Sequence, residues 1–135
     1  MFHAVENKYL GALRTESTHI KSSNVIITDA PTDNNGKGNA FSPTDLVASA
    51  LCSCMTTVMG IYADKNYFDF PKSTGYVTKI MSSNPRRISK IIIEINFDDN
   101  NLTKKQIEKL VSVAKGCPVA RSLNSNLIQE VKFNF

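Results

Sequence analysis

The sequence predicts an α+β fold in a single domain that covers residues 1–135. Three observations support this class. Strand-like segments lie at both ends of the chain and in its middle, a long uncharged segment follows a helix-start signal, and a second amphipathic helix lies in the last third. Hydrophobic residues make up 41% of the chain and charged residues 21%, which is typical of a folded globular protein.

The chain opens with strands. Tyr9–Arg14 predicts one strand with turn character at Gly11, and Asn24–Thr28 predicts another because it is rich in β-branched residues. Residues 32–39 are rich in Asn, Asp and Gly and predict a loop. This loop lacks the glycine spacing and the Lys-Ser/Thr ending of a phosphate-binding loop, so we expect it to be a solvated connection.

A long helix should follow. Ser42 is a good N-cap, Pro43 suits the first helical turn, and Asp45 takes the third position of a capping box. We expect the helix to end near Asp64, after about 30 Å at about 1.5 Å per residue. Residues 46–63 carry no charge, but Ser and Thr dilute their hydrophobicity, so we expect a helix buried in protein rather than in a membrane. A second copy of the chain could supply the cover it needs.

Two strands come next, and together they predict a hairpin. Gly75–Met81 leads through a turn at 82–85 into Ile88–Phe97, which alternates between apolar and polar residues. The apolar side chains that share one face of this second strand are Ile91, Ile93, Ile95 and Phe97. This face should be buried.

The last third of the chain predicts two helices and a closing strand. Thr103 and Gln106 form a second capping box, and Gly116 ends the helix that they start. Pro118 should open a short helix, and Ile128–Phe135 alternates as a strand.

Charge and composition narrow the range of functions. The net charge of +4 is modest, and acidic residues interrupt the basic ones, so no nucleic-acid interface is expected. The first nine residues lack the pattern of a secretion signal, and we expect a cytoplasmic protein. Three cysteines without the spacing of a disulfide framework should rest as thiols in that compartment unless they perform redox chemistry.

Cys54 and Cys117 are 63 residues apart (117 − 54) and can meet only in the folded chain. Cys117 precedes Pro118 and should be the N-cap of the short helix, where backbone N–H groups lower the pKa of a thiol. Cys54 lies in the middle of the long helix, where burial alone disfavours the thiolate unless a cation reaches it. Arg14 is the candidate cation. A small packing residue is the alternative reading at both cysteine positions.

Cys52 lies two residues from Cys54 and points about 200° around the helix, so we interpret it as a packing residue. Zinc bound by cysteines, with His3 or His19, is a rival interpretation. Structural zinc sites favour a wider cysteine spacing than this one, because two cysteines one residue apart on a helix diverge. We therefore predict neither a metal nor another cofactor.

Two segments carry a resemblance to a known family. The segments SPTDLVASALCSCM (42–55) and GCPVARSL (116–123), together with the stretch GALR (11–14), resemble the OsmC/Ohr family of bacterial redox proteins over nearly the whole chain. The resemblance implies the family's α+β fold, with antiparallel sheets around a long buried cysteine-bearing helix in an intertwined homodimer.

The resemblance also implies a function. It implies thiol-dependent reduction of hydroperoxides, organic ones above all, in defence against oxidative stress. Cys54 falls on the peroxidatic position, Cys117 on the resolving position, and Arg14 near the thiolate-stabilising arginine. The oxidised pair would be restored by a dithiol reductant, for which a lipoyl-type dithiol is one candidate.

One residue departs from the family pattern. The hydroperoxide reductases carry a glutamate ten residues before the peroxidatic cysteine, where it pairs with the arginine. Here that position is Thr44, and the adjacent Asp45 is interpreted as a capping residue. This places the chain closer to the broad OsmC-like branch. The alternative function is a non-catalytic OsmC-like dimer that binds a small apolar ligand.

Overall fold

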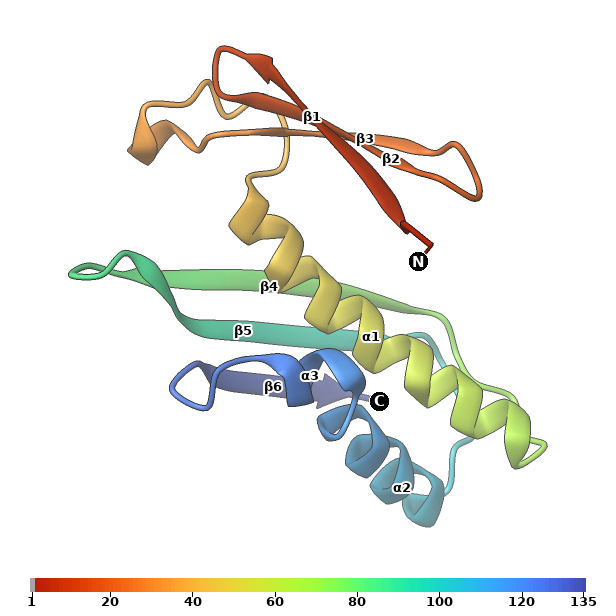
Figure 1. The fold of residues 1–135 in the computed structure, drawn as a ribbon. Coiled ribbons are helices and arrows are strands. Elements are labelled where there is room, and N and C mark those ends of the chain that lie inside the picture. The colour runs from red at the N-terminus through yellow and green to blue at the C-terminus, as the bar shows by residue number, and fades with distance from the viewer. Residues whose placement is uncertain (1) are drawn as a thin grey trace. The chain divides into compact units, whose positions relative to one another are not determined.

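The computed structural model describes residues 2–135, which form two compact units, residues 2–46 and residues 47–135. The first unit holds a small sheet and the loop that follows it, and the second holds a larger sheet with helices (Figure 1). The α+β class and the predicted order of elements are confirmed.

The sheet of the first unit has three antiparallel strands in the order β1-β2-β3. They are β1 (Val5–Gly11), β2 (Arg14–His19) and β3 (Val25–Asp29), the last within one residue of its predicted bounds. A short 3-10 helix, η1 (Thr32–Asn34), lies within the predicted loop.

The turn character predicted at Gly11 is confirmed, but the continuous strand predicted over Tyr9–Arg14 is wrong. Gly11, Ala12 and Leu13 all have positive φ (86°, 53° and 64°), and they form a tight turn that separates β1 from β2. The glycine tolerates this left-handed backbone at no steric cost, whereas the two residues after it adopt it under strain. Arg14 therefore opens a new strand, which the sequence conceals because that strand is polar throughout.

Helix α1 (Pro43–Lys65) begins as predicted and ends one residue later than expected. The backbone N–H of Ser42 donates to Oδ2 of Asp45 (2.9 Å), and the N–H of Asp45 donates to Oγ of Ser42 (3.1 Å). Both halves of the capping box are thus present. By length and composition α1 could also cross a membrane, with a mean hydropathy of 1.7 over its most apolar 18 residues.

The sheet of the second unit has the order β4-β5-β6. Strands β4 (Ser73–Ser82) and β5 (Arg87–Phe97) form the predicted antiparallel hairpin, and β6 (Ile128–Asn134) pairs with β5 in parallel. The expectation of purely antiparallel sheets is therefore corrected. Two helices, α2 (Lys104–Lys115) and α3 (Pro118–Ser122), connect β5 to β6, and such a crossover returns the chain in the same direction.

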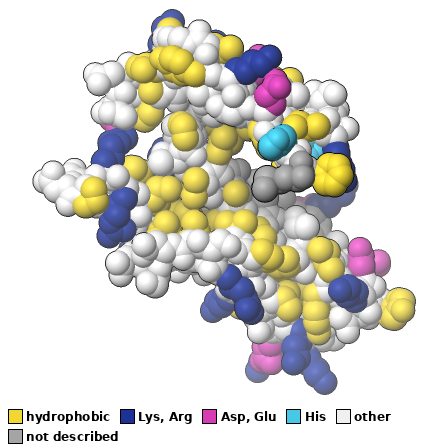
Figure 2. All heavy atoms as spheres, viewed as in Figure 1, with side chains coloured by type: hydrophobic (Ala, Val, Ile, Leu, Met, Phe, Trp, Pro, Cys, Tyr) yellow, Lys and Arg dark blue, Asp and Glu magenta, His cyan; other side chains and the backbone are white. Residues whose placement is uncertain are grey.

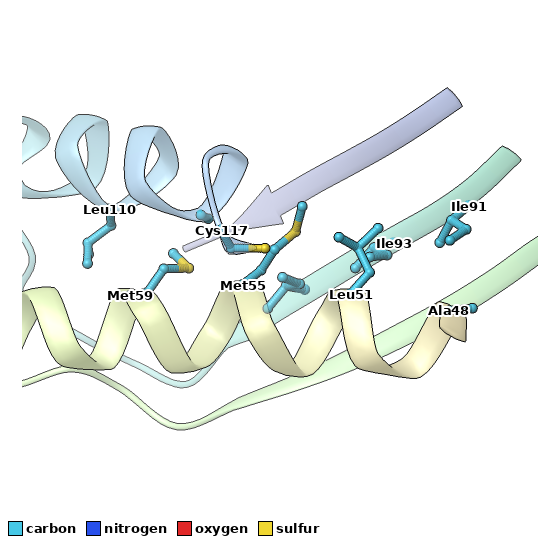
Figure 3. Close-up of a cluster of buried hydrophobic side chains, with 10 residues drawn as sticks. Ala48, Leu51, Met55, Met59, Ile91, Ile93, Leu110 and Cys117 are labelled. Atoms are coloured by element: carbon cyan, nitrogen blue, oxygen red, sulfur yellow. The ribbon is translucent and has the colours of Figure 1, made fainter. Parts of the chain in front are cut away.

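The core of the second unit lies between α1, α2 and strand β5 (Figure 3). Ile91, Ile93 and Ile95 have no exposed surface, as the alternating pattern predicts. They belong to one cluster with residues that recur on α1 at helical spacing and with residues of α2: Ala48, Leu51, Met55, Met59, Leu110 and Ala114. This packing fixes α1 against the helices that carry the second cysteine.

Cys52 packs toward strand β4. A Cβ atom added to Gly75 would lie only 2.6 Å from the Cys52 sulfur, so the thiol occupies the space that a side chain at Gly75 would need. Burial raises the pKa of the Cys52 thiol. Both observations agree with the interpretation of Cys52 as a packing residue.

We therefore expect Gly75→Ala to destabilise the protein by about 1–3 kcal/mol, the usual cost of overpacking. The cause is the contact with Cys52, so the penalty should be smaller when Gly75→Ala is introduced together with Cys52→Ala. Urea denaturation of the four proteins at one concentration measures this coupling. An equal penalty with and without the cysteine would show that the sulfur is not the obstacle.

Candidate functional site

The structure brings Cys54 and Cys117 together. Cys54 lies on α1 and is half-buried, whereas Cys117 is the N-cap of α3 and is only 1% exposed. The two side chains are near enough for Cys54 to raise the pKa of the Cys117 thiol, and both are free thiols. Both cysteines belong to the second unit: Cys54 lies in the middle of α1, and Cys117 directly precedes α3.

The sulfur of Cys117 caps helix α3. It accepts the backbone N–H of Ala120 at 3.4 Å, in the position that the Cys117-Pro118 pair predicts. In Figure 3 the Cys117 side chain points from the start of α3 toward α1, next to Met55. The cap thus presents the sulfur to the helix that carries Cys54.

The cap acts on the pKa of Cys117 in the predicted direction, but the net pKa of this thiol is raised. Burial raises the pKa of the Cys117 thiol, and the neighbouring Cys54 side chain raises it further. The backbone N–H groups of Ala120 and Val119 act in the opposite direction but do not outweigh these causes. Helix α3 has only five residues, so its dipole is small.

Arg14 lies in the first unit, at the start of β2, where it pairs with Asp29. Its Nε is 2.7 Å from Oδ1 and its Nη2 is 2.8 Å from Oδ2, a two-point contact between guanidinium and carboxylate. The Asp29 side chain is 3% exposed and that of Arg14 is 37% exposed. The hydrogen bond from Arg14 is the main cause that lowers the pKa of Asp29.

Sequence reasoning missed Asp29. Arg14 and Asp29 are direct partners in the β2–β3 register, so their side chains leave the sheet side by side. That register is visible only once β2 is recognised as a strand, and its polar sequence conceals it. The family resemblance points to position 44 for the carboxylate, but this residue is Thr44, whose hydroxyl lies 3.2 Å from that of Ser42. Asp45 closes the capping box, as interpreted.

The rival interpretation from the sequence is a metal site formed by cysteines and histidines. Among residues 2–135 no group of three or more His, Cys, Asp or Glu side chains could hold a metal ion. His19 bonds to the Ser22 hydroxyl through Nδ1 at 2.7 Å. A pocket of about 400 Å³ lies in the second unit, lined by Met55, Lys115, Gln129 and Val131.

Fold and site together define a class: an α+β protein that holds two thiols in contact between a long helix and a helix N-cap. The chain belongs to the OsmC-like protein family, whose model matches residues 36–132. Both cysteines lie within the matched segment, whereas Arg14 and Asp29 precede it. Among curated proteins, no sequence matches this chain.

Solved structures agree with the family assignment. A Psychrobacter arcticus protein, provisionally described as an osmotic stress induced and detoxification response protein, is 43% identical with a TM-score of 0.93, covering 99% of this chain and 97% of its own. The Legionella pneumophila organic hydroperoxide resistance protein OsmC is 15% identical (TM-score 0.74; 100% and 99% covered). Bacillus subtilis OhrB, also an organic hydroperoxide resistance protein, is 15% identical (TM-score 0.66; 98% of each chain covered). The OsmC/Ohr fold is thus shown.

Proposed function

We propose that this protein is a thiol-dependent peroxidase that reduces hydroperoxides, organic ones by preference. The proximity of Cys54 to Cys117 carries the proposal, because two neighbouring free thiols are placed for sulfur–sulfur chemistry. The hydroperoxide resistance proteins among its structural relatives support the same class of substrate.

The proposed cycle begins with the Cys54 thiolate. It attacks the terminal oxygen of the hydroperoxide, the O–O bond breaks, and an alkoxide leaves and takes a proton from solvent. Cys54 is then a sulfenic acid. The Cys117 sulfur attacks the Cys54 sulfur, a disulfide forms, and the hydroxyl group leaves as water with the proton of Cys117. A dithiol reductant, for which a lipoyl-type dithiol is a candidate, returns two hydrogens and is itself oxidised.

The order of attack is the one that the family resemblance implies, with Cys54 at the peroxidatic position and Cys117 at the resolving position. The raised pKa of the buried Cys117 thiol supports this order, because a thiol that is harder to ionise is the poorer first nucleophile. We propose Arg14 as the cation that stabilises this thiolate. The resemblance supports this role, and the two-point contact with Asp29 gives the guanidinium a fixed direction.

We also propose that the protein works as a homodimer in the cytoplasm, with its two units acting as one domain. Between residues 47 and 61 the exposed residues of α1 are uncharged: Val47, Ala50, Ser53, Thr57 and Ile61. Both units expose large apolar side chains, and hydrophobic atoms are prominent on the face in Figure 2. A second copy of the chain would cover such surfaces.

The alternative function is a non-catalytic dimer that holds a small apolar ligand. The pocket beside Met55 and Val131 favours it, since about 400 Å³ is enough for a small molecule. In that case both cysteines would be packing residues and would not respond to peroxide as a pair.

A thiol titration separates the two functions. The reduced protein should show three thiols, and excess cumene hydroperoxide should leave one, because Cys54 and Cys117 become a disulfide while Cys52 is half-buried against β4. Peptide mapping without reduction identifies the linked pair. A protein that keeps all three titratable thiols under excess oxidant is not a peroxidase.

A further inference from the structure

We propose that Asp29 is the positioning residue for Arg14 in this chain. It stands on strand β3, where it supplies a carboxylate that the start of α1 does not, since Asp45 is engaged with Ser42 and the preceding residue is Thr44. This inference rests on the proposed function, because it concerns what orients Arg14, the cation proposed to stabilise the Cys54 thiolate.

The first support is the geometry of the pair. A guanidinium bonded through both Nε and Nη2 to the two oxygens of one carboxylate has its plane and direction fixed. A lysine ammonium at the same position would reach the carboxylate as a single point and could swing. The long side chain of Arg14 therefore behaves as a rigid cation only while Asp29 holds it.

The second support is that Asp29 is itself held. Its Oδ2 also accepts the backbone N–H of Asn39 at 3.1 Å, and its own N–H donates to the carbonyl of Phe41 at 3.0 Å. The charge of Lys37 contributes to the lowered pKa of Asp29. The loop that follows β3 thus returns to the Asp29 carboxylate and bonds to it.

The loop adopts this path because of Gly36. A Cβ atom at this position would overlap the backbone carbonyl of Ala30, so only glycine lets the chain pass so closely. Residues 36–39, which appear in the sequence as an ordinary solvated loop, therefore form the support of Asp29. The buried carboxylate is paired, bonded and fixed on two sides, as a residue that orients another must be.

The test is the pH dependence of Cys54 alkylation by iodoacetamide, followed on the Cys54 peptide by mass spectrometry. If Arg14 stabilises the thiolate and Asp29 positions Arg14, Asp29→Asn should move the midpoint upward by about one pH unit. Arg14→Ala should move it at least as far. Asp29→Asn added to Arg14→Ala should move it no further, because the two residues act through one contact.

Two controls separate positioning from stability. Glu16→Gln removes a carboxylate from the same strand as Arg14 and should leave the midpoint unchanged. Arg14→Lys keeps the charge but loses the two-point contact, so it should give an intermediate midpoint. Thermal unfolding of each variant, measured in parallel, ensures that alkylation is read from folded protein.

The inference is overturned if Asp29→Asn leaves the midpoint in place, or lowers it, since a lower midpoint would mean that Asp29 merely neutralises Arg14. An unmoved midpoint in Arg14→Ala would overturn it as well. The proposed function fails separately, when cumene hydroperoxide leaves all thiols of the unaltered protein intact, whatever the alkylation midpoints show.

Discussion

Cys54→Ser is expected to reduce hydroperoxide consumption by a factor of about 10³ or more, to the rate without enzyme. Serine has no sulfur, so this variant has no thiolate at position 54 to attack the peroxide and cannot form a sulfenic acid there. Cys117→Ser is expected to behave differently. It should consume one equivalent of hydroperoxide and then stop, because Cys54 is oxidised but no neighbouring thiol resolves the product.

Turnover is measured by following cumene hydroperoxide loss with a dithiol reductant present. The one-equivalent reaction of Cys117→Ser is measured without reductant, because a dithiol would itself reduce the sulfenic acid, and dimedone then traps this product. Cys52→Ser is the matched control, since Cys52 lies on the same helix but packs against β4, and its turnover should remain near that of the unaltered protein. Full turnover in Cys54→Ser would exclude the proposed nucleophile. If Cys54→Ser consumed one equivalent of hydroperoxide and Cys117→Ser consumed none, Cys117 would be the nucleophile and Cys54 the resolving residue.

Ile93→Ala should lower the free energy of unfolding by about 2–5 kcal/mol. Ile93 has no exposed surface and lies in the central strand, between Val77 of β4 and Val131 of β6 in register. Truncation leaves a cavity beneath α1 that the flanking strands cannot fill without losing their own pairing. Such a loss is a large fraction of the stability of a domain of this size.

Denaturant unfolding at fixed protein concentration measures this loss, with Ile80→Ala as the control. Ile80 is 42% exposed in the adjacent strand, and the same truncation there should cost about 1 kcal/mol or less. Equal losses at the two positions would contradict the assignment of the β5 apolar face to the core.

The sequence predicted those parts of the fold that local chemistry controls. Both capping boxes, Ser42 with Asp45 and Thr103 with Gln106, start helices where expected, because each satisfies its backbone donors within four residues. The alternation in β5 predicted its buried face for a similar reason. Cys117 as an N-cap followed from the proline next to it.

What the sequence did not reveal depends on residues far apart in the chain. Strand β2 has no apolar face of its own and is defined by its pairing with β1 and β3. The parallel register of β6 depends on the crossover, and the pairing of Arg14 with Asp29 depends on the β2–β3 register. The raised pKa of Cys117 depends on burial and on Cys54, neither of which its immediate neighbours encode.

The contact between two sulfurs 63 residues apart (117 − 54) has a mechanical consequence. A bond between them would tie the middle of α1 to the start of α3 and enclose the β4–β5 hairpin and α2 in one covalent ring. A ring of this size removes disorder from the denatured ensemble worth about 4 kcal/mol. The oxidised form would therefore resist denaturation better than the reduced form. In each catalytic cycle a covalent link across most of the second unit would form and then be reduced.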